Sequence, residues 1–194
     1  VSTVPGAFKP NAATPEAAAR IAEQLLRHAA HLVALERATG RCIVLALEPE
    51  PCCLLETVAE TERFFREHLH SGAAAVRLGE LAAIEPAAAA AALRRHLGVC
   101  LDLCHAAVEF EDPVECVRAL EQAGIAIAKV QVTAGLRLPR VDEDALAALR
   151  GLEDAVYLHQ VVERGPAGLR RYPDIADARV AGHWRDAPSE WRVH

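Results

Sequence analysis

The sequence predicts an α/β fold with a parallel sheet. Short apolar runs lie at residues 41–48, 98–103, 125–133 and 155–162. Segments with helical spacing separate or flank them, at residues 15–38, 57–69, 86–96, 112–124 and 142–150. Strands that are apolar on both faces and are separated by helices belong in a parallel sheet with right-handed crossovers. This pattern leaves an open doubly wound sheet and a closed barrel as alternatives, and the absence of a Gly-rich phosphate loop after these runs disfavours a dinucleotide-binding version.

The starts of three helices are marked by capping residues. Thr14 precedes Pro15, which gives an N-cap followed by a proline at the first helical position. Thr57 and Glu60 form a capping box, and a second box with a following proline opens at Asp112. These signals predict helices that begin close to residues 15, 58 and 113.

The length indicates one domain. The chain has 194 residues, whereas a complete eight-stranded α/β barrel usually needs about 250. It begins at Val1 and ends in a strand-like run, residues 190–194. We therefore expect a single domain, 1–194, that is truncated at both ends.

Composition excludes several classes of partner. The net charge is −6 and no dense block of Lys or Arg occurs, which argues against nucleic acid. The apolar runs are too short for a membrane span. The six cysteines lack the spacing of a zinc knuckle or ribbon, so we expect reduced, mostly buried thiols and a cytoplasmic protein. The histidines of the predicted helices, His96 among them, are expected on solvated faces.

Polar residues follow or interrupt the apolar runs where parallel strands would end. In α/β barrels the chemistry lies at the carboxyl ends of the strands, because the βα loops gather there. The residues in question are Glu48, Glu50, Asp102, His105, Lys129, Gln131, Thr133 and His159. The strand period of two places Lys129, Gln131 and Thr133 on one face, with Lys129 directed into the mouth of a barrel.

Glu48, Asp102 and His105 together predict a metal site. A single carboxylate could instead cap a helix or pair with an arginine, and a single histidine is more often a hydrogen-bonded structural residue. Three such groups at neighbouring strand ends would be a costly burial of charge without a cation. Two carboxylates and an imidazole suit a divalent ion, with Zn, Mn and Mg as the candidates.

Several of these motifs resemble one family. The segments EPEPCCLLET (48–57), GVCLDLCHAAVEFED (98–112), KVQ (129–131), YLHQVV (157–162) and EWRVH (190–194) are similar to stretches of the sugar isomerase/epimerase superfamily of xylose-isomerase-like TIM barrels, which includes endonuclease IV. The likeness is greatest to the metabolite-traffic barrel proteins of ebo-type bacterial operons and covers almost the whole chain. It implies a (β/α)8 TIM barrel, incomplete in this chain.

The resemblance also implies roles for individual residues. Glu48 and Asp102 match two metal ligands of the superfamily, His105 matches a histidine of endonuclease-like members, and Gln131 stands where many isomerases have a histidine ligand. Glu50 replaces the lysine of the xylose isomerase signature. The implied metal ligands are Glu48, Asp102, His105 and Gln131; the catalytic residues Glu48, Lys129 and His159; the substrate-binding residues Glu50, Gln131 and Thr133.

Three functions follow from this set of residues. The first is metal-dependent isomerisation or epimerisation of a sugar, sugar phosphate or cyclitol by proton transfer next to a polarised carbonyl. The second is a metal-dependent phosphoesterase similar to endonuclease IV, which the acidic charge of the chain opposes for a DNA substrate. The third is a non-catalytic metabolite-binding or traffic protein. The expected partner is a small polyol or sugar, and a homodimer is left open.

Overall fold

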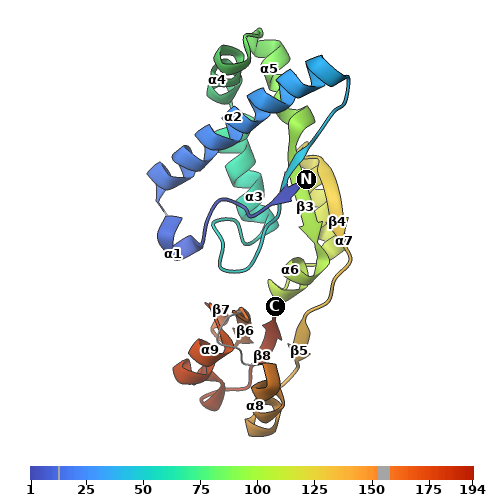
Figure 1. Ribbon diagram of the computed structural model, residues 1–194. Helices are drawn as coiled ribbons and strands as arrows, with labels where there is room; N and C mark the ends of the chain where they lie inside the picture. Colours follow the sequence, from blue (N-terminus) through green and yellow to red (C-terminus); the bar gives the residue numbers. More distant parts are fainter. Residues whose placement is uncertain (13, 153–157) are drawn as a thin grey trace.

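The computed structural model describes residues 1–12, 14–152 and 158–194 and has a mixed α/β architecture with two four-stranded sheets (Figure 1). The first sheet is parallel and has the order β1-β2-β3-β4. Its strands are β1 (Ser2–Thr3), β2 (Leu45–Leu47), β3 (Leu97–Asp102) and β4 (Ile127–Gln131). The second sheet is antiparallel and has the order β5-β8-β6-β7. Its strands are β5 (Leu136–Leu138), β6 (Val161–Gly165), β7 (Gly168–Tyr172) and β8 (Glu190–Val193).

The helices that precede, connect or follow the parallel strands are α1 (Lys9–Ala12), α2 (Pro15–Thr39), α3 (Val58–Phe64) continued by a π-helix, η1 (Phe65–Leu69), α4 (Gly72–Ala82), α5 (Pro86–His96), α6 (Leu103–Val108) and α7 (Pro113–Gln122). Of these, α2, α3 and α7 begin where the capping residues predict. The side chains of Thr14, Thr57 and Asp112 accept backbone N–H groups of the first turns of α2, α3 and α7. Each therefore satisfies donors that a helix start leaves without a partner. None of the described helices combines the length and hydropathy needed to cross a membrane.

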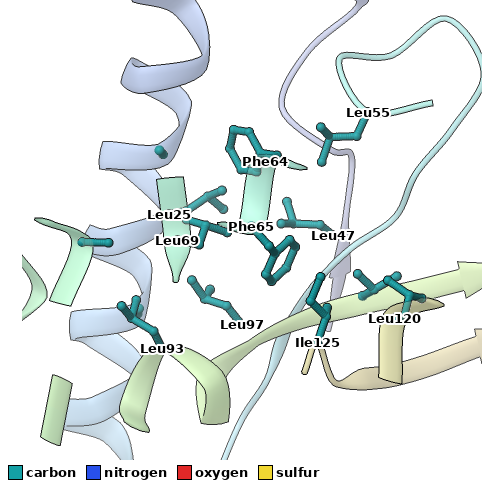
Figure 2. Packing of buried hydrophobic residues seen from close by; sticks show 14 of the residues in the cluster. Leu25, Leu47, Leu55, Phe64, Phe65, Leu69, Leu93, Leu97, Leu120 and Ile125 are labelled. Atoms are coloured by element: carbon teal, nitrogen blue, oxygen red, sulfur yellow. The ribbon is translucent and has the colours of Figure 1, made fainter. Parts of the chain in front are cut away.

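One hydrophobic core joins the parallel sheet to helices α2 to α5 and α7. Phe64 and Phe65, at the junction of α3 and η1, lie between leucines of α2, β2 and β3 (Figure 2). Phe65 and Leu69 are fully buried, and Ile125 contributes from the segment before β4. The long helix α2 crosses one side of this arrangement, with α4 and α5 beside it (Figure 1). The amphipathic pattern of residues 15–38 thus has its apolar face in this core.

The other face of the parallel sheet is concave. Lys129 lies on β4 and Ser2 on β1, with β2 and β3 between them, yet the Lys129 Nζ donates to the Ser2 Oγ at 3.0 Å. In a flat sheet these strands would be about 14 Å apart, beyond what one lysine side chain spans. The sheet therefore curls toward this face, on which Lys129 and Gln131 lie, and the polar ends of its strands are drawn together.

The prediction that residues 155–162 form a strand of the parallel sheet is wrong for the part that can be judged. Residues 153–157 lie outside the described residues, and residues 158–160 precede strand β6. His159 therefore lies before a strand and not within one. β6 pairs antiparallel with β7, and the pair Gly165 and Gly168 closes a two-residue turn. A turn this short can join only antiparallel strands, because a parallel connection must cross the length of the sheet.

A second core lies within the antiparallel unit. The helices of this unit are α8 (Glu143–Leu149), η2 (Arg150–Leu152), α9 (Ile175–Ala181) and η3 (His183–Arg185). Trp191 of β8, Val161 of β6 and Ile175 of α9 are fully buried in this core, and Leu146 of α8 packs with them. The described residues therefore form four parallel and four antiparallel strands, and a complete eight-stranded parallel barrel is not what they show.

The cysteines are all free, and five of the six are buried, as expected; Cys42 is exposed. The expectation that helix histidines lie on solvated faces is wrong for His96, which is 1% exposed. Its helix, α5, is followed directly by β3, so the last residue of the helix is covered by the segment of the same chain that contains Ile43.

Helix α6 lies between the two sheets: it contacts β3 and β4 of the parallel sheet and β8 of the antiparallel sheet. The parallel sheet with its helices, and the antiparallel sheet with its helices, are called the parallel and antiparallel units. Glu109, which follows α6, accepts hydrogen bonds from the guanidinium of Arg171 on β7, and Arg171 also lies 3.4 Å from Glu56. Arg192 of β8 donates to the backbone oxygen of Ala107. The side chain of Glu109 is fully buried, and within residues 1–12, 14–152 and 158–194 one of its oxygens finds no hydrogen-bond partner.

We predict that Glu109 makes stability depend on pH. Burial raises the pKa of Glu109 to about 7, against the opposing effect of Arg171. The native state then binds a proton that the unfolded state has already released, so stability falls as the pH rises from about 4.5 to about 7, by up to about 3 kcal/mol. In Glu109→Gln this loss should disappear. The free energy of unfolding of the variant, minus that of the wild type, should therefore increase as the pH rises across this range. Urea unfolding at several pH values measures it. The exposed Glu115→Gln is the control, and parallel curves for Glu109→Gln and wild type would contradict the prediction.

Candidate metal centre

Three neighbouring parallel strands bring polar side chains to one end of the sheet. Glu48 directly follows β2, and its backbone N–H continues the sheet by donating to the Thr3 oxygen at 3.0 Å. Asp102 is the last residue of β3 and Gln131 the last residue of β4, and the two are register partners. The strand register thus places an aspartate and a glutamine side by side, with Glu48 next to them.

Glu48, Asp102 and His105 converge as the sequence predicted. Each offers a ligand atom, and these atoms all lie within 4.8 Å of one another. Asp102 and His105 are 4% and 6% exposed, and the Glu48 side chain is 18% exposed. His105 reaches the site because Asp102 caps α6: its carboxylate accepts the backbone N–H groups of Cys104 and His105, which fixes the first turn against the strand end.

The amide of Gln131 lies between the two carboxylates. Its Nε2 donates to Glu48 Oε1 at 2.6 Å and to Asp102 Oδ2 at 2.5 Å. Lys129 Nζ donates to the Gln131 Oε1 at 2.5 Å, and this contact fixes which end of the amide faces the carboxylates. Lys129 and Gln131 therefore share a face, as predicted. An amide nitrogen is not a metal ligand, so a cation and this NH2 group compete for the same two oxygens.

The carboxylate of Asp102 is held in its charged form. Burial opposes its ionisation, but hydrogen bonds from Thr133 and Gln131 lower the pKa of Asp102 below its usual value. Thr133 also accepts the backbone N–H of Cys104 at 3.2 Å, so this residue positions Asp102. Glu50 differs, because burial raises its pKa, with further upward contributions from the charges of Glu48 and Asp102.

His105 and His194 form a pair of imidazoles. His105 Nδ1 lies 2.8 Å from the Pro49 carbonyl oxygen, which only accepts, so this nitrogen carries the hydrogen. His194 Nδ1 lies 3.0 Å from Gln160 Oε1 and donates in the same way. The two Nε2 atoms then face each other at 3.0 Å with lone pairs on both. Such a contact is stable only with a second proton on one ring or a cation between them, and burial next to His105 lowers the pKa of His194.

The remaining predicted residue, His159, lies beside this pair. Its backbone N–H donates to Asp174, and its Nδ1 is buried with no hydrogen-bond partner among the described residues. It also contributes to the lowered pKa of His194, after burial and His105. The sequence predicts no role for His194. Its only signal is its place at the end of the strand-like EWRVH run, which does not show what the run packs against.

The residues present fit a divalent cation. Two ionisable carboxylates and an imidazole with its Nδ1 hydrogen fixed by a backbone carbonyl are a common donor set for such ions, and the carbonyl contact is the usual support of a histidine ligand.

The chain matches no protein-family model, no curated protein and no solved structure. The likeness to xylose-isomerase-like barrels therefore remains an expectation carried by the sequence motifs.

We predict that removing the Gln131 amide favours cation binding. In Gln131→Ala the two carboxylates lose their common donor, and the free energy of unfolding should fall by about 1–3 kcal/mol without added metal. Added Mn²⁺ should then raise the melting temperature of the variant by more than that of the wild type, because the amide no longer competes for the oxygens. Thermal unfolding with and without Mn²⁺ measures both effects. Gln122→Ala, at an exposed helix end, is the control, and equal Mn²⁺ shifts in Gln131→Ala and wild type would refute the idea.

Proposed function

We propose that this chain is part of a xylose-isomerase-like TIM-barrel protein that binds a divalent cation among Glu48, Asp102 and His105. We further propose that it catalyses isomerisation or epimerisation of a sugar, sugar phosphate or cyclitol. The observation that carries the proposal is the convergence of these three side chains at the carboxyl ends of adjacent parallel strands. In barrel enzymes this end of the sheet is where the catalytic residues gather.

The strand order supports a barrel over a doubly wound sheet. β1, β2, β3 and β4 are neighbours in the order in which they occur in the chain. A doubly wound sheet reverses its order at a switch point, whereas a barrel winds in one direction. The contact between Lys129 and Ser2 adds the curvature that closure requires.

The chain's own groups have distinct parts in the proposed reaction. A bound cation would hold two substrate oxygens and polarise a carbonyl. Glu48, the more exposed of the two carboxylates, takes the proton from the carbon next to that carbonyl and returns it to a substrate carbon, so the C–H bond broken is replaced by another. Asp102, charged and buried, remains a ligand, while Lys129 on the concave face donates to a substrate oxygen.

One observation favours a second candidate, a non-catalytic metabolite-binding protein. The Gln131 amide satisfies an oxygen of each carboxylate, and Thr133 and two backbone N–H groups satisfy the second oxygen of Asp102. Both oxygens of Asp102 and one oxygen of Glu48 are thus paired without a cation, so the same side chains could serve as hydrogen-bonding groups for a polyol. Metal binding and proton exchange separate the two candidates.

The metal site is tested by two matched variants, Asp102→Asn and Asp112→Asn. Both aspartates cap a helix through one oxygen that accepts two backbone N–H groups, and asparagine caps equally well. Only Asp102 lies in the proposed site. Equilibrium dialysis against Mn²⁺ should show about one bound ion in wild type and in Asp112→Asn, and at least about tenfold weaker binding in Asp102→Asn. Equal binding by all three proteins would eliminate the site.

The chemistry is tested by proton exchange with the solvent. Sugars, sugar phosphates and cyclitol ketones are incubated with the Mn²⁺-loaded protein in D2O, and deuterium at the carbon next to the carbonyl is followed by NMR. Exchange that is lost in Glu48→Gln supports the enzyme. Mn²⁺ binding without any exchange would leave the binding protein as the function.

A further inference from the structure

A second cluster of metal-ligating side chains lies at the opposite end of the parallel sheet. Glu36 comes from the last turns of α2, Cys42 from the segment before β2, and His96 is the last residue of α5, directly before β3. One ligand atom from each lies within 4.8 Å of the others. The sites differ in composition, because this one offers a thiol in place of a second carboxylate.

The ring of His96 is set as a ligand would be. It is 1% exposed, and its Nδ1 lies 2.9 Å from the Ile43 carbonyl oxygen, which makes Nδ1 the nitrogen that carries hydrogen. The Nε2 is directed at Glu36 Oε2 at 3.0 Å. Histidines that bind metals almost always donate their other N–H to a carbonyl or carboxylate in this way.

Two helix ends favour a cation here. Helices α2 and α5 both end at this point, and the last carbonyl groups of a helix carry partial negative charge. Arg95 donates to both oxygens of Glu36, so a bound ion would have to share or displace this contact. Glu36 Oε2 also faces the imidazole of His96. Cys42 is exposed, and its Sγ has a long contact of 3.9 Å to the Arg95 oxygen.

We propose that Glu36, Cys42 and His96 bind a zinc-class transition metal ion. Thiolate, imidazole and carboxylate together are a donor set that Zn²⁺ and Co²⁺ accept, with water in the fourth position. A tetrahedral ion needs its ligand atoms about 3.3–3.8 Å apart. The atoms of His96 and Glu36, at 3.0 Å, would therefore move slightly apart, and the exposed Cys42 would move toward them. On binding, the thiol releases its proton to solvent and the sulfur forms the bond to the ion. The ion would then link the C-terminal ends of α2 and α5 to the segment that precedes β2.

The test uses Co²⁺ as a probe, because a thiolate bound to Co²⁺ gives a charge-transfer band in the near ultraviolet that carboxylate and imidazole ligands do not give. The full chain, kept reduced, is titrated as wild type, Cys42→Ser and Cys100→Ser. Cys42 is exposed, so its replacement leaves the core untouched. Cys100 is the matched control, because its pKa is affected by Glu48 and it is thus the thiol beside the candidate metal centre.

The proposal expects a band in wild type that saturates with about one Co²⁺, survives in Cys100→Ser and is lost in Cys42→Ser. A band that survives Cys42→Ser, or no band in wild type, overturns it and leaves the Glu36 and His96 contact as an ion pair. Asp102→Asn should retain the band. The result is therefore independent of the Mn²⁺ binding on which the proposed function depends.

Discussion

The hydrogen bonds of the Gln131 amide hold the candidate metal centre together. Two carboxylates from adjacent strands, Glu48 and Asp102, would repel each other if nothing lay between them. Gln131 supplies both hydrogens of one NH2 group to them, and Lys129 fixes the orientation of the amide from the other side. The strand register makes this possible, because Gln131 is the partner of Asp102 across β3 and β4. The same geometry that stabilises the charges also places an amide where a cation would bind.

The two ends of the parallel sheet are built differently. At the carboxyl ends of the strands, charge is introduced by side chains that follow the strands, and Asp102 serves both as cap of α6 and as a member of the site. At the amino ends, the partial charges come from the ends of α2 and α5, and the ligating groups Glu36 and His96 belong to those helices. An α/β crossover always brings a helix end next to a strand start, so the second cluster is a direct product of the chain topology.

Local signals in the sequence predicted most of the parallel unit. The caps Thr14, Thr57 and Asp112 mark helix starts correctly, and the rule that parallel strands align their carboxyl ends predicts that Glu48, Asp102 and His105 lie together, as they do. The helix at residues 142–150 and the strand-like run at 190–194 were predicted correctly, as α8 and β8. The antiparallel pairing was missed because residues 155–162 are apolar on both faces, while the turn between Gly165 and Gly168 decides the strand direction. His96 was misjudged because the carbonyl that covers it, at Ile43, is distant in sequence.

The antiparallel unit contributes directly to the site, which is the least expected consequence of its topology. His194 follows β8, and its Nε2 meets that of His105 of α6 at 3.0 Å. This contact depends on how β8 packs against α6. Two interactions hold them together: the hydrogen bond from Arg192 to the Ala107 oxygen, and the buried pair of Glu109 and Arg171. The second imidazole is therefore present only when the two units are docked. A loss of the Glu109 contact should loosen His194 before it disturbs Glu48 and Asp102, since both of these are held within the parallel sheet.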